Sequence, residues 1–234
     1  MNKFILAFIM FFIMISASLA DSNVYITQSG ANLDLDITMD GNNNAVGLAN
    51  DRTLLTGNNL DVDIDLIGAS NVVTGDFIGA GESGADDLKI NQTGSTNTTA
   101  LNVGSSAATD DVSIIENRIG SSGVTSYLVG SAATVQDVSI TVDVVGDDID
   151  ITLIENSSSS GSDKTTDIDI ATDSDDVDII ITHTGAGAHK TKLLCTGSCA
   201  GSDFTISQTG ANSTVVDLTV TNATSSDVDI TITD

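Results

Sequence analysis

Both histidines and both cysteines of the chain fall within one short segment near its C-terminal end. They are His183, His189, Cys195 and Cys199, in the spacing His-x5-His-x5-Cys-x3-Cys. Two imidazoles and two thiolates form a ligand set that suits tetrahedral Zn²⁺. In an exported protein, the two cysteines would instead form a disulfide around the Thr-Gly-Ser turn between them. We predict the Cys195–Cys199 disulfide and no metal site, with zinc on all four residues as the alternative.

A second group of candidate ligands is acidic, because aspartates alternate with Ile, Leu or Val in six stretches. These stretches begin at Leu33, Leu60, Asp148, Asp167, Asp176 and Asp227. Alternate side chains of a strand point to opposite faces, so the apolar residues are predicted to point inward and the aspartates outward. Stacked strands would place the carboxylates about 5 Å apart, and Ca²⁺ or other cations would relieve their repulsion. The calcium repeat Gly-Gly-x-Gly-x-Asp is absent. We therefore expect diffuse cation binding and no dedicated cofactor.

Catalysis has little support in the sequence. The nucleophile motif Gly-x-Ser-x-Gly and the zinc-protease motif His-Glu-x-x-His are both absent. Enzymes that cleave polysaccharides on β-solenoids use basic residues and aromatic platforms. This chain has only 7 Lys and Arg residues and 3% aromatic residues. We predict that the protein is not an enzyme.

Residues 1–20 have the features of a secretory signal peptide. Lys3 precedes an apolar run of residues 4–15, and the small-x-small sequence Ala-Ser-Leu-Ala follows at residues 17–20. The run is shorter than the ~20 residues that span a bilayer. We therefore predict export and no membrane insertion after cleavage. The formal net charge of −26 excludes nucleic acid as a natural partner, because the phosphate backbone would repel the protein.

Three units of the sequence each contain a glutamine and share one pattern. Apolar and polar residues alternate into Gln28, Gln92 and Gln208, and a glycine follows two residues later. Because this alternation has period two, each glutamine is predicted to point inward with the apolar residues. The glycine and the asparagine after it are predicted to supply the positive-φ positions of a tight turn. The predicted turn glycines are Gly30, Gly94 and Gly210, and the predicted amide-ladder residues are Gln28, Asn32, Gln92, Asn97, Gln208 and Asn212.

The pattern Ser-x5-Gln-x-Gly-x-x-Asn resembles the curlin repeat of the secreted subunits of curli amyloid fibres. The unit at Gln92 has the Gln-Gly-Asn spacing, with Asp86 in place of the leading serine. The units at Gln28 and Gln208 have the serine, but their asparagine comes one residue early, and the closing glutamine is missing from all three. The resemblance covers three short stretches and indicates a divergent curlin-like protein. It implies a β-solenoid whose subunits join end to end through exposed strand edges.

Turn residues recur at a short period along the chain. Gly30 to Gly41 is 11 residues, as are Gly57 to Gly68 and Gly68 to Gly79. Two half-rungs of about 11–12 residues would make one rung of a two-sided solenoid, and residues 21–234 would form a single domain of roughly nine rungs. An antiparallel β-sandwich is the alternative. The pattern is least regular over 45–52, interpreted as a bulged-out arc, and over 156–162, interpreted as a flexible loop.

The sequence therefore predicts an all-β, secreted structural protein, located outside the cell or at its surface. The expected role is that of a subunit of curli-like amyloid fibres or of an adhesive matrix in a biofilm, with further copies of the same chain as partners. The rival interpretation is a monomeric acidic β-solenoid that binds cations or a surface ligand.

Overall fold

The computed structural model describes residues 13–16, 22–47, 52–57, 59–79, 86–104, 112–130, 137–156, 163–172, 176–210 and 212–233. Strands joined by turns and irregular connections make up these residues, and none of them is helical. Accordingly, the described part of the chain has no helix long and apolar enough to cross a membrane.

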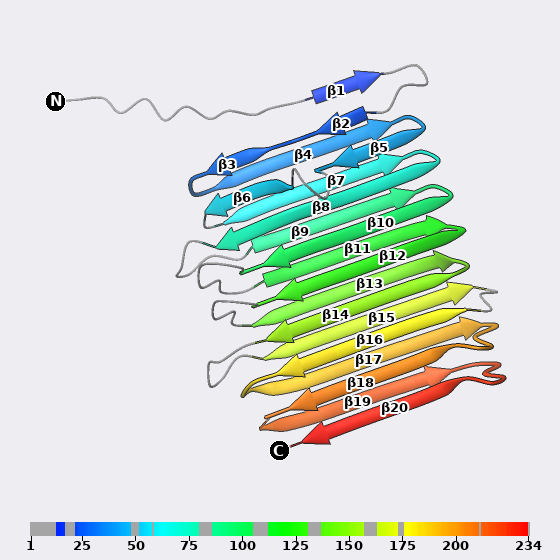
Figure 1. The fold of residues 1–234 in the computed structure, drawn as a ribbon. Coiled ribbons are helices and arrows are strands. Elements are labelled where there is room, and N and C mark those ends of the chain that lie inside the picture. Colours follow the sequence, from blue (N-terminus) through cyan, green and yellow to red (C-terminus); the bar gives the residue numbers. More distant parts are fainter. Residues whose placement is uncertain are drawn as a thin grey trace.

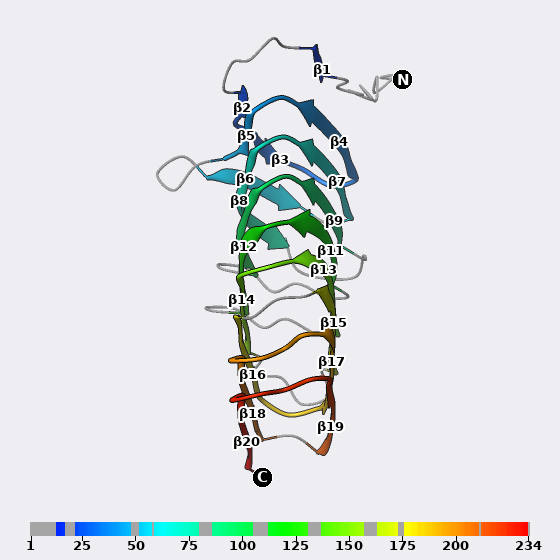
Figure 2. The ribbon, with the colours of Figure 1, turned by 90° about the vertical axis from the view of Figure 1, so that its right-hand side faces the viewer.

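The strands alternate between two parallel sheets that face each other, as Figures 1 and 2 show. Sheet A contains, in spatial order, β1 (Ile13–Ser16), β4 (Leu33–Asp40), β7 (Leu60–Ile67), β9 (Asp86–Thr93), β11 (Val112–Gly120), β13 (Val138–Gly146), β15 (Lys164–Thr172), β17 (Ala188–Gly197) and β19 (Ser213–Val220). Sheet B contains β2 (Ser22–Val24), β5 (Asn43–Val46), β8 (Ser70–Gly79), β10 (Thr96–Val103), β12 (Ser122–Val129), β14 (Ile149–Asn156), β16 (Val177–Thr184), β18 (Asp203–Thr209) and β20 (Asp227–Thr233). In the same sheet β3 (Thr27–Ser29) pairs with β6 (Thr53–Gly57), and β6 pairs with β8. The predicted all-β solenoid is confirmed.

The rungs are longer and fewer than predicted. Ser70 pairs with Thr96, and Thr96 with Ser122, which is a step of 26 residues per rung. The solenoid has about seven turns, whereas nine were predicted. The glycines used to infer the period lie at short connections between strands. Other connections are longer, such as the one between Val129 and Val138. A period inferred from the short connections alone is too small.

Near the N-terminal end, the residues that alternate into Gln28 are divided between two short strands, β2 and β3. β5 and β6 both pair with β8, in line with each other, with Val46 opposite Val73 and Thr53 opposite Gly75. The predicted arc over 45–52 includes residues 48–51, which lie outside the described residues. Arg52, directly before β6, forms an ion pair with β8, because its Nε is 2.8 Å from Oδ1 of Asp76.

The core is the narrow space between the two sheets. Burial alternates along the strands, as in β7, where every second residue from Leu60 to Leu66 is buried. Parallel pairing in register places equivalent side chains on successive layers. One column runs from Leu35 through Val62 to Leu88 and is buried throughout. Full burial of each aliphatic side chain contributes about 1.5–3 kcal/mol, so a thin core can be stable with few aromatic residues.

Candidate functional site

An amide ladder lies inside the corner that leads from sheet A to sheet B. It consists of Asn44 on β5, Asn71 on β8 and Asn97 on β10, which are all buried and directly paired from layer to layer. Nδ2 of Asn44 donates to Oδ1 of Asn71 at 3.1 Å, and Nδ2 of Asn71 donates to Oδ1 of Asn97 at 2.9 Å. Each amide also donates to a corner carbonyl oxygen, as Asn44 does to Ile67 at 2.9 Å. Stacking therefore supplies partners for amides that would be costly to bury alone, except for Oδ1 of Asn44 at the start of the ladder, which accepts no hydrogen bond.

A column of glycines accompanies this ladder at the same corner. A Cβ on Gly68, Gly94, Gly120 or Gly146 would lie closer than 3.0 Å to the carbonyl oxygen of the glycine one layer before, a separation that real Cβ atoms essentially never show. None of these four glycines has a positive φ. Close approach of successive layers, and not backbone handedness, is what requires glycine here.

Gln92 and Gln208 are buried, as predicted for the inward glutamines. Nε2 of Gln92, on β9, donates to the carbonyl oxygen of Thr98 at 3.2 Å, and Oε1 of Gln92 lies 3.2 Å from Oγ1 of Thr99. Nε2 of Gln208, on β18, donates to Oγ1 of Thr191 at 2.9 Å. The two glutamines lie in different sheets, and each is bonded to local threonines instead of to another glutamine.

Gln28 differs from the other two glutamines because it is exposed. It pairs with the buried Leu55, which places it in an inward row of sheet B. The predicted direction therefore agrees with the register, but the predicted burial is wrong. β3 belongs to the terminal layer of sheet B, so only one neighbouring layer covers its side chains.

The predicted turn residues have their expected conformation in the first unit, whereas in the last unit the glycine has a positive φ but Asn212 does not. Gly30, Asn32 and Gly210 have positive φ values of 147°, 59° and 79°. Gly94 and Asn97 do not, which corrects the prediction for the middle unit. Gln92 precedes a corner from sheet A to sheet B, and Asn97 is part of β10, beyond that corner. Gln28 and Gln208 precede corners of the other kind, from sheet B to sheet A. In the last unit, Asn212 is exposed, and its backbone N–H donates to the carbonyl oxygen of Gly187 at 2.8 Å.

Charged side chains lie inside the solenoid, which the sequence analysis did not predict. Glu116 and Arg118 point inward from β11 and are 0% and 2% exposed. The Glu116 carboxylate accepts hydrogen bonds from the hydroxyl groups of Thr99, Thr125 and Tyr127, each at 2.8 Å. An amino group of Arg118 donates to Oγ1 of Thr125 at 2.8 Å. Two buried opposite charges are thus linked through the hydroxyl group of Thr125, and Glu116 accepts hydrogen bonds from two strands of the facing sheet.

Burial and neighbouring charges shift the pKa values of Arg118 and Tyr127 in this network. Burial lowers the pKa of Arg118, and the charge of Glu116 opposes that shift. Burial, followed by Glu116, raises the pKa of Tyr127 well above its usual value, so its hydroxyl stays protonated and donates. The Arg118 guanidinium also occupies the space beside Gly123, where a Cβ would collide with it. Gly123 is the position that continues the column of Asn97, so the amide ladder ends where Arg118 enters.

A second polar cluster lies inside the corner that leads from sheet B to sheet A, on strands β14 to β18. Its members are Glu155, Lys164, Thr166, His183, His189, Thr191 and Gln208, all buried. Oγ1 of Thr166 donates to Oε1 of Glu155 at 2.7 Å, and Nε2 of His183 is 3.3 Å from the same oxygen. The rings of His183 and His189 meet edge to face, with centroids 5.5 Å apart. Burial lowers the pKa of Lys164, and Glu155 opposes that shift.

His189 makes this cluster sensitive to acid. Burial, and then the charges of Lys164 and His183, lower its pKa to about 4, while Glu155 and the Gly185 backbone act in the opposite direction. Neither ring nitrogen has a hydrogen bond of standard geometry. Between pH 6.5 and pH 4, the unfolded chain therefore binds a proton at His189 that the folded chain does not. Stability falls as the pH drops through this window.

We expect this effect to reduce the free energy of unfolding by about 3 kcal/mol between pH 6.5 and pH 4, because one pKa unit corresponds to 1.36 kcal/mol. Urea unfolding of the unmodified protein and of His189→Leu at several pH values measures it. The aspartates titrate in both proteins, so the difference between the two pH profiles isolates His189. Parallel profiles would contradict the assignment.

Cys195 and Cys199 form a disulfide, and both are buried. The bond closes the connection from β17 to β18. His189 lies six residues before Cys195 on β17, about 20 Å along an extended strand. The four residues of the zinc alternative are therefore not brought together. Within the described ranges, no group of three or more His, Cys, Asp or Glu side chains is placed to hold a metal ion.

Outward aspartates stack in rows, as predicted. On sheet A, Asp34, Asp61 and Asp87 are directly paired from layer to layer. Partial burial, followed by the charges of Asp63, Asp34 and Asp87, raises the pKa of Asp61. A longer row on sheet B contains Asp150, Asp178, Asp203 and Asp227. Here too, partial burial and neighbouring aspartates raise the pKa of Asp178.

Lysines interrupt these rows in two places on sheet A. Lys89 follows Asp63 in the row next to Asp61, and its Nζ is 3.9 Å from Asp63. Nζ of Lys192 lies 2.8 Å from Asp167 and 3.2 Å from Asp169. The outer faces are therefore rows of carboxylates with few local counter-charges, suited to diffuse cation screening.

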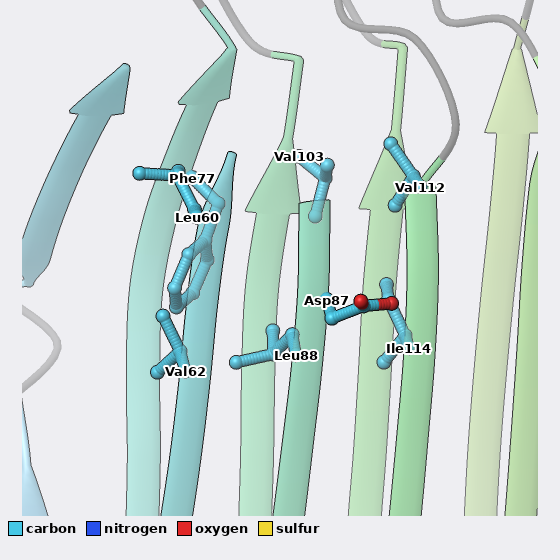
Figure 3. A pocket seen from close by; sticks show the side chains of 8 residues that line it. All are labelled: Leu60, Val62, Phe77, Asp87, Leu88, Val103, Val112 and Ile114. Atoms are coloured by element: carbon cyan, nitrogen blue, oxygen red, sulfur yellow. The ribbon is translucent and has the colours of Figure 1, made fainter. Parts of the chain in front are cut away.

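One small crevice lies where β7, β9 and β11 face the ends of β8 and β10 (Figure 3). Its walls are Leu60, Val62, Phe77, Asp87, Leu88, Val103, Val112 and Ile114. The space measures about 20 Å³, which is room for one water molecule and for no organic ligand.

The two ends of the rod differ from its middle. In β20, the last described strand, the inward row Val228, Ile230 and Ile232 is 43%, 45% and 50% exposed. One layer further in, Phe204 and Ile206 occupy the same columns and are each 1% exposed. At the other end, β2 and β3 are terminal in sheet B, and β1 lies on β4 in sheet A (Figure 1). The C-terminal end therefore exposes apolar side chains beside an unpaired strand edge.

The sequence contains a periodic signal for the amide ladder. Asn44 and Asn71 follow Gly41 and Gly68 by three residues, as Asn97 follows Gly94. The inward charges also have a signal, because steps of two residues from the apolar Ile114 reach Glu116 and then Arg118. Alternation gives their direction but not the residues that they meet.

The comparisons with known proteins identify no relative: no family model, curated protein or solved structure matches this chain.

Proposed function

We propose that the protein is a secreted structural subunit that joins end to end into extracellular curli-like fibres or an adhesive surface matrix. The observation that carries this proposal is the open C-terminal layer. Val228, Ile230 and Ile232 lie in the inward rows of the core but are about half exposed. A further layer would cover them and would pair the free edges of β19 and β20.

Export is part of the proposal. Of the predicted signal peptide, residues 1–20, only Ile13–Ser16 are described, as β1, and the rest lie outside the described residues. Cleavage after residue 20 would remove β1 and leave β4 as the terminal strand of sheet A. An oxidising compartment also suits the Cys195–Cys199 disulfide. The net charge of −26 argues against nucleic acid as a partner, and we assign no catalytic role.

Electron microscopy of the exported protein tests this function. The chain is expressed with residues 1–20, recovered from outside the cell, and checked by mass spectrometry for its N-terminus. We expect long unbranched filaments that bind an amyloid dye. Their assembly rate should increase with salt, because screening reduces repulsion between subunits. A lasting monomer at high concentration and high salt would contradict the proposal.

The rows of outward aspartates favour a second candidate, a monomeric acidic solenoid that binds cations. In the row Asp150, Asp178, Asp203 and Asp227, like charges face each other on successive layers. A divalent cation would relieve this repulsion. If this candidate is right, Ca²⁺ will raise the unfolding temperature of a protein that remains monomeric. In the fibre proposal, Ca²⁺ accelerates assembly.

A further inference from the structure

We infer that the outer face of sheet A is an interface with a second copy of the chain, which lies face to face with the first and antiparallel to it. The two copies are related by a twofold axis that runs along the strands, between β11 and β13. In Figure 2, this face is the one that points away from sheet B. The inference concerns the side of the rod, whereas the proposed fibre joint uses its ends.

The charges of this face are unevenly distributed along the rod. Among the described strands, the outward-pointing cations are Lys89, Lys190 and Lys192, which all lie on sheet A. Two of them are on β17, one layer from the C-terminal edge of the sheet, whereas outward aspartates crowd β4 and β7 at the other end. A face that is acidic at one end and carries lysines at the other complements a second copy turned end over end.

The first outward column shows this complementarity. From β4 to β19 it consists of Asp34, Asp61, Asp87, Ser113, Ser139, Thr165, Lys190 and Val215. The twofold axis reverses the order of the layers and keeps each residue in its column. Asp61 therefore faces Lys190 of the second copy, and Asp87 faces the hydroxyl group of Thr165. Each pair occurs twice, because the same patch of both copies forms the interface.

The second outward column places ion pairs beside each other. It consists of Asp36, Asp63, Lys89, Ile115, Thr141, Asp167, Lys192 and Asp217. Reversal brings Asp63 opposite Lys192 of the second copy, and Lys89 opposite Asp167. Within one copy, Nζ of Lys89 already lies 3.9 Å from Asp63, and Nζ of Lys192 lies 2.8 Å from Asp167. The four side chains form a square in which the sign of the charge alternates. The like-charged pair at the ends of this column lies at the rim, where solvent screens it.

The third outward column contributes amides. Reversal brings Asn117 opposite Asp143 of the second copy, and Asn91 opposite Asp169. Within one copy, the amide nitrogen of Asn117 donates to Asn91, and that of Asn91 donates to Asp65. An amide nitrogen carries two hydrogens, so each can also donate to a carboxylate across the interface.

Apolar side chains and contact area also suit this interface. Ile119 and Val145 point outward from β11 and β13, where they are 55% and 50% exposed. The twofold axis places each opposite the other residue of the second copy, so docking covers both. The eight strands from β4 to β19, with four outward residues each, offer about 1,000 Å² per copy. Stable interfaces bury about 800 Å² per partner.

Other arrangements of the same two faces bring like charges together. A twofold axis along the rod places Asp63 opposite Asp65 and leaves all three lysines without carboxylates opposite them. An axis along the strands but on β13 places Lys89 opposite Lys192. The distribution of charge therefore selects the antiparallel arrangement centred between β11 and β13.

Zero-length cross-linking of the unmodified, exported protein tests this arrangement. A carbodiimide joins lysine amines to the carboxylates with which they form ion pairs. In one rod, β7 and β17 are five layers apart, about 24 Å, so a link between Lys190 and Asp61 forms only between copies. We expect peptide mass spectrometry to find this link in covalent dimers. The Lys192–Asp167 link, within one copy, is the positive control. Covalent dimers that lack the Lys190–Asp61 link would overturn the interface.

Reversing the charges of this pair separates a specific contact from general repulsion. Asp61→Lys makes the chain less negative, so general repulsion predicts tighter association. The interface predicts a dissociation constant about tenfold higher, because two lysines then face each other at two symmetric places. Combining Asp61→Lys with Lys190→Glu keeps the net charge of the unmodified chain and should restore the dissociation constant to within about twofold. Sedimentation equilibrium at 0.15 M salt measures all three proteins.

The outcomes distinguish this inference from the proposed function. Filaments without the Lys190–Asp61 link, or dimers that Asp61→Lys does not weaken, overturn the interface and leave the fibre function intact. Linked dimers that never form filaments support the interface and contradict the fibre function. A protein that stays monomeric at every concentration overturns both.

Discussion

Replacing Glu116 by alanine is expected to lower the free energy of unfolding by about 3–5 kcal/mol. The change leaves the Arg118 guanidinium buried without the nearby negative charge that opposes the effect of burial. It also removes the acceptor of three hydroxyl groups, those of Thr99, Thr125 and Tyr127. Burial already lowers the pKa of Arg118, so the cation depends on Glu116 for its compensation. Urea unfolding followed by circular dichroism measures the loss.

The double variant Glu116→Leu with Arg118→Leu is the matched control. It removes both charges and fills the space with apolar atoms, which in other proteins is often neutral or stabilising. We expect the double variant to be more stable than Glu116→Ala by at least about 2 kcal/mol. If both proteins lose the same stability, the buried packing and not the unpaired charge determines the cost.

Replacing Gly94 by alanine is expected to cost about 3 kcal/mol or more, because the added methyl group meets backbone that cannot turn aside. Its Cβ would lie closer than 3.0 Å to the carbonyl oxygen of Gly68 and to the side-chain amide nitrogen of Asn71. The collision therefore separates two layers and disturbs the amide ladder that ties them. Thermal and urea unfolding both measure this loss.

Ser95→Ala is the control for Gly94, since Ser95 is the exposed neighbour at the same corner. A surface change of this kind alters stability by no more than about 0.5 kcal/mol. A Gly94→Ala protein as stable as the Ser95→Ala protein would show that the layers can move apart at this corner without loss.

The strands and their facing were determined by the sequence alone, because alternation with period two is a local property. Leu60 to Ile67 reads as a half-buried strand, and its aspartates point outward in the structure. The disulfide was also predictable, since an oxidised pair four residues apart needs only a turn between its cysteines. The amide ladder had a readable signal as well, in the Gly-x-x-Asn spacing at Gly41, Gly68 and Gly94.

The partners across layers were decided only by the tertiary structure. A residue's neighbour lies 22 to 28 positions away, as in the pairs Thr53–Gly75, Ser70–Thr96 and Ile149–Val177. That interval depends on the lengths of the connections, which alternation does not constrain. Glu116 thus meets threonines from β10 and β12, and His183 and His189 lie together, apart from Cys195. Local periodicity sets the direction of each side chain, whereas the closure of whole rungs sets the residue that it contacts.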